Sequence, residues 1–266
     1  MIALDDFLNL AAASAGFVCV AMLVVWAISV RIRDASIVDI FWGAGFAGIS
    51  LVGLSLGAGD FERRALVAAL TVAWGLRLAA YLFARNRGEG EDSRYQSMRR
   101  RHGDRFAIVS LRTVFAFQGI MMLVVALPVA VAQSTTGIPL GSLDALGAAL
   151  WACGLAFEAI GDIQLARFKA DPRNAGQVMD RGLWAWTRHP NYFGDFLVWW
   201  GIGLTAASAA LPWPLVAALG PALMSFLLLR VSGVALLERR MKRTRPGYAE
   251  YAARTPAFFP RPPRSA

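Results

Sequence analysis

Residues 196–229 read FLVWWGIGLTAASAALPWPLVAALGPALMSFLLL and contain no charged residue. As a single α-helix these 34 residues would be ~51 Å long, whereas the hydrocarbon core of a bilayer is only ~30 Å thick. Pro212 and Pro214 interrupt the stretch, and a proline inside a helix removes a backbone hydrogen bond. The stretch therefore predicts two membrane-spanning helices, over about 190–211 and 215–237, joined by a short turn.

Five further apolar stretches precede this hairpin. They cover residues 7–30, 36–57, 65–84, 113–133 and 143–165. The composition agrees with them: 57% of the 266 residues are hydrophobic and 17% are charged, against roughly 45–50% and 25% in soluble domains. It excludes a disordered chain, a disulfide scaffold and a soluble enzyme. We expect an all-α, polytopic membrane bundle of about seven spans that forms a single domain, residues 1–266.

The basic residues predict how this bundle is oriented. Of the 27 Lys and Arg residues, 23 lie in four segments, 31–35, 85–112, 165–190 and 238–266. Cytoplasmic loops carry the excess of Lys and Arg, so the N-terminus is expected outside and the C-terminus in the cytoplasm. The same rule and anionic headgroups account for the net charge of +9 without a nucleic-acid partner.

Three other features are not interpreted as catalytic or binding sites. The segment GAGFAG at residues 43–48 fits the dinucleotide fingerprint, but it lies within an apolar helix, where small residues allow close helix packing. The two histidines form no cluster, so no metal site is expected. His102 lies within a run of arginines, 99–105, which is expected to face the cytoplasmic membrane surface.

Polar residues concentrate instead at the end of the fifth stretch. Glu158, Asp162 and Lys169 are spaced i, i+4 and i+11, so they share one face of a helix. Charged side chains near the end of a membrane-spanning helix usually face a cavity or one another. This face is therefore a candidate binding surface, and an interfacial ion pair is the alternative interpretation.

A second polar motif, RHPNY at residues 188–192, directly precedes the next apolar stretch. Pro190 suits the first turn of a helix, whose free N–H groups and positive dipole end attract anions. Arg188 could form a bidentate contact with a phosphate group, and Asp195 lies on the same helix face. Together with the preceding helix, this motif predicts a site for a phosphate-rich cofactor.

The segment 182–201 resembles the steroid 5-alpha-reductase-like membrane reductases, above all their bacterial members described only as a domain of unknown function. Similar motifs appear at WGLRL 74–78, RGEGED 87–92 and Arg94-Tyr95. The resemblance implies a bacterial inner-membrane reductase that binds NADPH at the cytoplasmic face and a flat lipophilic substrate between helices. The portion 157–266 would bind the cofactor through Asp162, Lys169, Asn174, Arg188, His189, Asn191, Tyr192, Asp195, Arg240 and Tyr248.

The residues at the expected catalytic positions differ from the family pattern. Steroid-reducing relatives pair a carboxylic acid with a tyrosine, but Trp74 occupies the tyrosine position here. Asp39 lies roughly where the acid is expected, and Tyr81 shares a helix face with Trp74. We expect Asp39 and Tyr81 to be catalytic. The alternatives are a Ser36-x-x-Asp39 capping box and an interfacial anchoring role for Tyr81.

Two other classes of function remain open. Isoprenylcysteine methyltransferases, which use S-adenosylmethionine, are similar over the Arg-His-Pro motif and the C-terminal tail. That cofactor carries no phosphate, so Arg188 and Lys169 would be needed less. A non-enzymatic membrane scaffold would bind no dinucleotide at all. The partners expected are a lipophilic small molecule and membrane lipids, and nothing in the sequence implies a protein partner.

Overall fold

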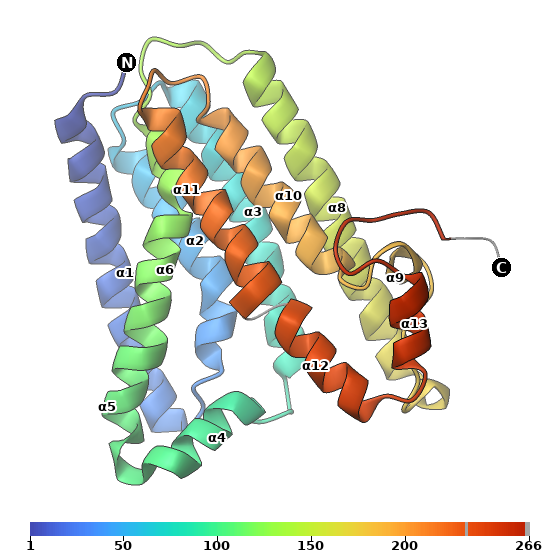
Figure 1. Ribbon diagram of the computed structural model, residues 1–266. Coiled ribbons are helices and arrows are strands. Elements are labelled where there is room, and N and C mark those ends of the chain that lie inside the picture. Colours follow the sequence, from blue (N-terminus) through green and yellow to red (C-terminus); the bar gives the residue numbers. More distant parts are fainter. Residues whose placement is uncertain (232–233, 264–266) are drawn as a thin grey trace. The chain divides into compact units, whose positions relative to one another are not determined.

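The computed structural model describes residues 1–231 and 234–263, without the side chains at positions 235, 236, 239 and 240. Every regular element in these ranges is a helix and none is a strand, which confirms the all-α prediction (Figure 1). The chain divides into two compact units. Unit 1 comprises Met1–Ala145 and Ile202–Gly220, and unit 2 comprises Leu146–Gly201 and Pro221–Ala266. The single domain expected over residues 1–266 stays a prediction.

Six helical segments are long and apolar enough to cross a membrane, by length and composition. They are Leu4–Ile32 (α1), Ile37–Leu56 (α2), Phe61–Asn86 (α3), Ser93–Val125 (α4 to α6), Ser142–Ala170 (α8) and Trp213–Val231 (α11 and a π-helical turn). The predicted span at 190–211 corresponds to α10, Pro190–Thr205, whose 16 residues extend only ~24 Å. The count of seven and the orientation of the termini stay predictions.

The proline-containing stretch forms two helices, as its sequence predicts. One helix, α10, ends at Thr205, and α11 begins at Trp213, so Pro212 and Pro214 lie at the break. However, α11 ends at Phe226 rather than continuing to residue 237. The chain continues as a π-helical turn, Leu227–Val231, and then as α12, Val234–Thr244.

In unit 1, α2 and α3 pack with their backbones in close contact. A Cβ atom added to Gly75 would collide with the carbonyl oxygen of Gly43, and one added to Gly43 would collide with that of Gly75. Such contact requires residues without side chains at the crossing. The segment 43–48 is therefore a packing surface, as expected, and not a dinucleotide fingerprint.

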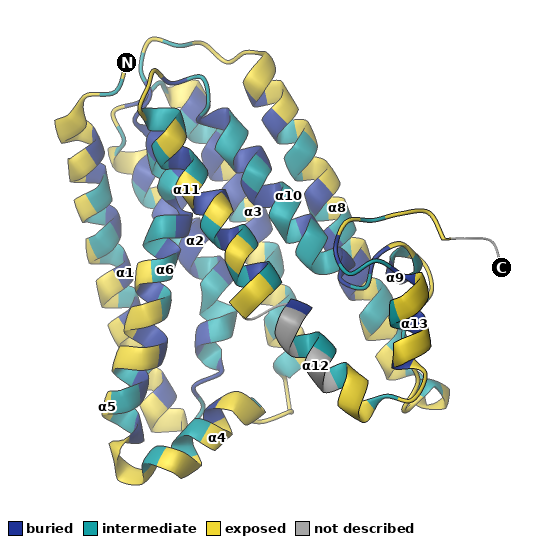
Figure 2. Ribbon diagram, in the orientation of Figure 1, coloured by how far each residue is buried: buried dark blue, intermediate teal, exposed yellow. Residues whose placement is uncertain are grey.

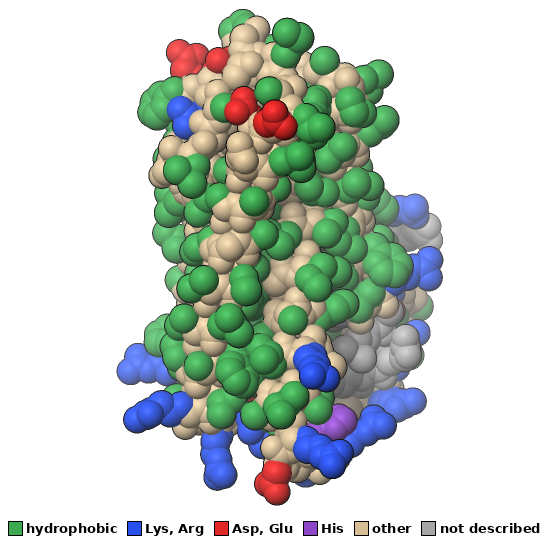
Figure 3. Space-filling model, turned by 90° about the vertical axis from the view of Figure 1, so that its left-hand side faces the viewer, with side chains coloured by type: hydrophobic (Ala, Val, Ile, Leu, Met, Phe, Trp, Pro, Cys, Tyr) green, Lys and Arg blue, Asp and Glu red, His purple; other side chains and the backbone are tan. Residues whose placement is uncertain are grey.

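The outer surface of unit 1 has the composition of a lipid-facing surface. Leu23, Val24 and Ile28 are exposed on α1 (Figure 2). On the face of unit 1 that includes α1 and α5 (Phe106–Ser110), hydrophobic side chains cover the length of the helices, and Lys and Arg gather at one end (Figure 3). This distribution supports an integral membrane protein.

One basic residue between the second and third apolar stretches of the sequence is buried. Arg63 lies in the first turn of α3 with 1% of its side chain exposed, and its guanidinium group forms an ion pair with both carboxylate oxygens of Asp144. It also donates to the carbonyl oxygen of Thr205 at 2.6 Å. Arg63 is thus a structural residue of unit 1, because a buried charge is tolerated only when it is paired and hydrogen-bonded.

Candidate functional site

In unit 2, the loop before α10 folds back onto α8. Gly182 adopts a positive φ of 59°, which favours glycine, and the indole N–H of Trp184 donates to the carbonyl oxygen of Gly161 at 3.0 Å. The side chain of Gln164 accepts from the backbone N–H of Leu183, also at 3.0 Å. These contacts therefore hold the backbone of the loop against α8.

The same loop delivers the polar motif to the start of α10, which begins at Pro190 as predicted. Asn191 lies in the first turn and donates through Nδ2 to Oδ1 of Asp162 at 3.2 Å. Asp162 comes from α8 and is only 3% exposed. Two predicted site residues separated by 29 positions are therefore in contact at a helix N-terminus.

Arg188 has a different environment from the one its motif suggests. Its Nε donates to Glu238 of α12 at 2.8 Å, and its Nη1 donates to the carbonyl oxygens of Ala252 and Thr255. Only 10% of the side chain is exposed. In this arrangement the guanidinium group ties the C-terminal tail to the loop, and its role as a phosphate contact stays a prediction.

Glu238 is the centre of this network. Its carboxylate lies 3.6 Å from Nε2 of His189, whose ring stacks on that of Tyr192 with a centroid distance of 5.5 Å. The contacts with His189 and Arg188 outweigh burial and lower the pKa of Glu238 to about 2. At 2.8 Å, Arg188 is the closer of the two partners. Burial and the nearby Glu238 charge raise the pKa of Tyr248.

The C-terminal tail completes this network. The helix α13, Tyr248–Arg254, is fixed by the hydroxyl group of Tyr251, which donates to the carbonyl oxygen of Trp184 at 2.6 Å. Beyond it, the hydroxyl group of Thr187 donates to the carbonyl oxygen of Phe258 at 2.8 Å. Residues that are about 70 positions apart thus form one polar cluster.

The other predicted cofactor residues lie around this cluster in unit 2. Lys169 is exposed near the end of α8, and Asp195 is half-buried in α10. Asn174 donates to the carbonyl oxygen of Phe168 at 2.9 Å, so it closes the turn after α8. The side chain of Arg240 lies outside the described residues.

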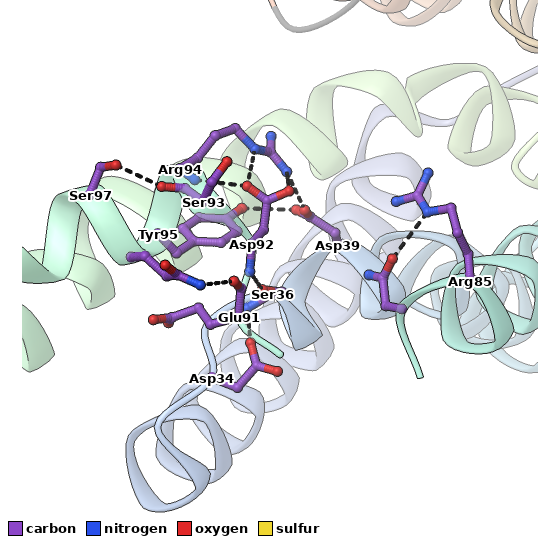
Figure 4. Close-up of polar contacts among 12 residues, drawn as sticks. Asp34, Ser36, Asp39, Arg85, Glu91, Asp92, Ser93, Arg94, Tyr95 and Ser97 are labelled. Atoms are coloured by element: carbon purple, nitrogen blue, oxygen red, sulfur yellow. Dashed lines mark hydrogen bonds and ion pairs between the residues drawn. The ribbon is translucent and has the colours of Figure 1, made fainter. Parts of the chain in front are cut away.

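Both predicted catalytic residues belong to unit 1. The Oδ1 atom of Asp39 accepts from the hydroxyl group of Tyr95 at 2.9 Å, and Oδ2 lies 2.7 Å from Nη2 of Arg94 (Figure 4). The alternative interpretation of Asp39, a capping box with Ser36, is wrong: Ser36 makes no side-chain cap hydrogen bond, and its hydroxyl group accepts from the backbone N–H of Asp92 at 2.6 Å. Asp39 is therefore held by the first turn of α4 (Ser93–His102) and not by its own helix end.

Tyr81 lies in α3, and its neighbours are basic. The guanidinium carbons of Arg77 and Arg85 are 6.0 Å and 5.8 Å from the centroid of its ring. Trp74, on the same helix, is fully buried. Cation–π contacts of this kind fit an anchoring role as well as a catalytic one.

Two residues of these clusters were not predicted. Tyr95 belongs to the Arg94-Tyr95 pair, which resembles the family motif, but its distance of 56 positions from Asp39 hides their contact. Glu238 is the acidic residue that directly precedes the basic pair at 239–240. An isolated carboxylate beside several arginines was the available signal for an ion pair, although its partner could not be read from the sequence.

The comparisons with known proteins identify a family. The model of the family described as "Protein of unknown function (DUF1295)" matches residues 25–255. No curated protein and no solved structure was found to match the chain. Because the match covers most of its length, including both clusters, the chain belongs to the DUF1295 family.

Proposed function

We propose that this protein is an NADPH-dependent membrane reductase, which reduces a C=C bond conjugated to a carbonyl group in a steroid-, isoprenoid- or lipid-like substrate. The resemblance of residues 157–201 to steroid 5-alpha-reductase-like proteins supports the proposal, and the DUF1295 family is broadly linked to that group. The observation that carries it is the contact between Asp162 and Asn191 at the N-terminus of α10. It combines a buried carboxylate, an amide and a helix N-terminus in unit 2.

The residues of unit 2 fit the chemistry of a dinucleotide. A carboxylate such as Asp162 accepts from ribose hydroxyl groups, while the start of α10 and the cation of Lys169 suit phosphate groups. Tyr192 and Asn191 add polar groups on the first turn of the same helix. In this proposal Arg188 does not need to touch phosphate, because its contacts with Glu238, Ala252 and Thr255 hold the tail against the loop.

When bound, NADPH supplies the hydride to the carbon atom beta to the carbonyl group. The residues of the chain must bind the carbonyl oxygen, stabilise the charge that develops on it and provide a proton. Asp39 is the predicted acid, but it accepts from two donors in the structure, as a carboxylate does. The hydroxyl group of Tyr95 carries the proton of this pair, and we assign it as the donor together with Asp39.

The environment of Arg188 also favours the methyltransferase alternative. S-adenosylmethionine carries no phosphate, and the guanidinium group of Arg188 is paired with Glu238 rather than open to an anion. The two functions differ in the nucleotide that binds, so a binding experiment separates them.

The test is equilibrium binding of NADPH, NADH and S-adenosylmethionine to the purified protein in mild detergent. We expect NADPH to bind, and Asp162→Asn to weaken it by about tenfold or more, since a hydrogen bond to a charged group contributes ~1.5–3 kcal/mol. Asp171→Asn is the matched control, because Asp171 is in the same unit and pairs with the exposed Arg173. Binding of S-adenosylmethionine alone would establish the alternative, and binding of neither would favour a scaffold.

Catalysis is tested by NADPH oxidation in the presence of a panel of lipophilic enones. In the reductase, Asp39→Asn lowers turnover by about 10²–10⁴-fold, the usual contribution of acid–base catalysis, while NADPH still binds. Full activity of Asp39→Asn would exclude Asp39 and leave Tyr95 or Tyr81 as the acid.

A further inference from the structure

The helix α4 lies across the end of unit 1 and is turned away from the helix that follows it (Figure 1). The turn occurs at Gly103, whose φ is 52°. The apolar stretch after the turn, residues 113–133, follows the exposed Arg112 and extends ~30 Å as a helix, which is the thickness of the hydrocarbon core. A hydrocarbon core placed over this stretch leaves α4 and residues 103–105 beyond it, on the side of the lipid headgroups.

The inner side of α4 is fastened to the start of α2 by acidic residues. Glu91 accepts from Nη2 and Nε of Arg99 at 2.7 Å and 3.0 Å, and from the backbone N–H of Ala35 at 2.9 Å. Burial opposes the ionised form, but these contacts outweigh it and lower the pKa of Glu91. The guanidinium carbon of Arg99 also lies 4.1 Å from the ring centroid of Phe106. These contacts fix which side of α4 faces the protein.

The same contacts divide the charged residues of this segment into those that form ion pairs and those that do not. Glu91 pairs with Arg99, and Asp39 and Asp92 both pair with Arg94. These three carboxylates are thereby paired with two arginines. Arg100, Arg101 and Arg105 remain exposed, and no ion pair among the described residues involves them. Within 100–105, Asp104 is the single acidic residue.

We propose that Arg100, Arg101 and Arg105, the α4 arginine surface, bind the phosphate groups of anionic phospholipids in the membrane that holds the protein. Three points support this partner: the position of α4 at headgroup level, the excess of positive charge on its outer side, and the planar donor groups of arginine, which match phosphate oxygens. The surface is a defined lipid site, distinct from the general excess of basic residues at this end of unit 1. The proposal does not depend on the reductase function.

The test is binding of dioctanoyl phosphatidylglycerol to the purified protein in neutral detergent. Binding is measured as the shift that the lipid causes in the melting temperature of the protein. The wild-type protein should prefer phosphatidylglycerol to dioctanoyl phosphatidylcholine. The variant R100Q/R101Q/R105Q should lose affinity by about fivefold for each arginine removed, and the wild-type affinity should fall with added salt. The unliganded melting temperature of the variant should match that of the wild type, because the three side chains are exposed.

The matched control is R31Q/R33Q/R87Q, which removes three exposed arginines from the same unit. It should keep the wild-type affinity for phosphatidylglycerol. An equal loss in both triple variants, or no preference of the wild type for phosphatidylglycerol, would overturn the proposal. Competition by inorganic phosphate or 2′,5′-ADP at the α4 arginine surface would also overturn it, in favour of a site for a soluble phosphate or nucleotide.

Discussion

The hydroxyl group of Tyr95 donates to Oδ1 of Asp39 at 2.9 Å, and Arg94 holds Oδ2 of the same carboxylate at 2.7 Å. Tyr95 is 6% exposed, and its oxygen also accepts from Nε2 of Gln118 at 3.4 Å. Within this cluster the transferable proton is on the phenol, while the carboxylate orients it. In the proposed reductase Tyr95 would be the proton donor and Asp39 its positioning group.

Replacing Tyr95 by Phe tests this assignment, since it removes the proton and retains the ring. Turnover of a lipophilic enone should fall by about 10²–10⁴-fold, and NADPH binding should be unchanged. Tyr81→Phe is the comparison variant, because Tyr81 is the competing candidate in unit 1 and loses the same atom. Loss of turnover in Tyr81→Phe, with an active Tyr95→Phe, would reverse the roles of the two residues.

The tail of unit 2 should depend on Arg188. Arg188→Ala leaves the carboxylate of Glu238 and two carbonyl oxygens without their donor, which costs about 3–5 kcal/mol for a buried ion pair. Limited proteolysis of the tail and thermal unfolding in detergent should both detect this loss. Arg254→Ala removes an exposed pair with Asp180 and should cost about 1 kcal/mol or less. Equal effects of the two substitutions would contradict the structural role of Arg188.

Acid should weaken the same network. The pKa of Glu238 falls from its ordinary 4.5 to about 2 in the folded protein, so the folded state binds this proton less readily than the unfolded state. The stabilisation is fully present above pH 4.5 and is lost as the pH falls from 4.5 toward 2. Thermal unfolding of wild type and Glu238→Gln across this range measures it. The variant should show a smaller loss of stability, and parallel curves would contradict the assignment.

The crossing of α2 and α3 should not tolerate a methyl group. In Gly75→Ala the new Cβ atom meets the carbonyl oxygen of Gly43, so the helices must separate and the melting temperature should fall, with a cost of about 1–3 kcal/mol. Gly16→Ala is the control, because no atom lies within 4 Å of the new Cβ and alanine favours a helix. A Gly75→Ala protein as stable as Gly16→Ala would contradict the close packing.

The sequence alone determined which segments form helices and which of these are apolar enough for a membrane. A predominantly apolar run of about 20 residues is stable only in lipid or a core, so 7–30 and 36–57 predicted α1 and α2 from composition. The proline residues predicted where helices begin and end, because their effect on the backbone is also local. Pro190 begins α10, and Pro212 precedes α11, because a ring without an N–H group suits a first turn or a break.

The tertiary structure decided which polar groups meet. Arg63 lies between two apolar stretches of the sequence, where a loop residue is expected. In the structure it pairs with Asp144, 81 positions away, and is buried. The motif around Arg188 suggested a contact with phosphate, yet its side chain pairs with Glu238, 50 positions away. Hydrophobic burial depends on the composition of each segment, which a sequence shows directly. An ion pair depends on the distance between two particular atoms, and that distance exists only once the helices have packed.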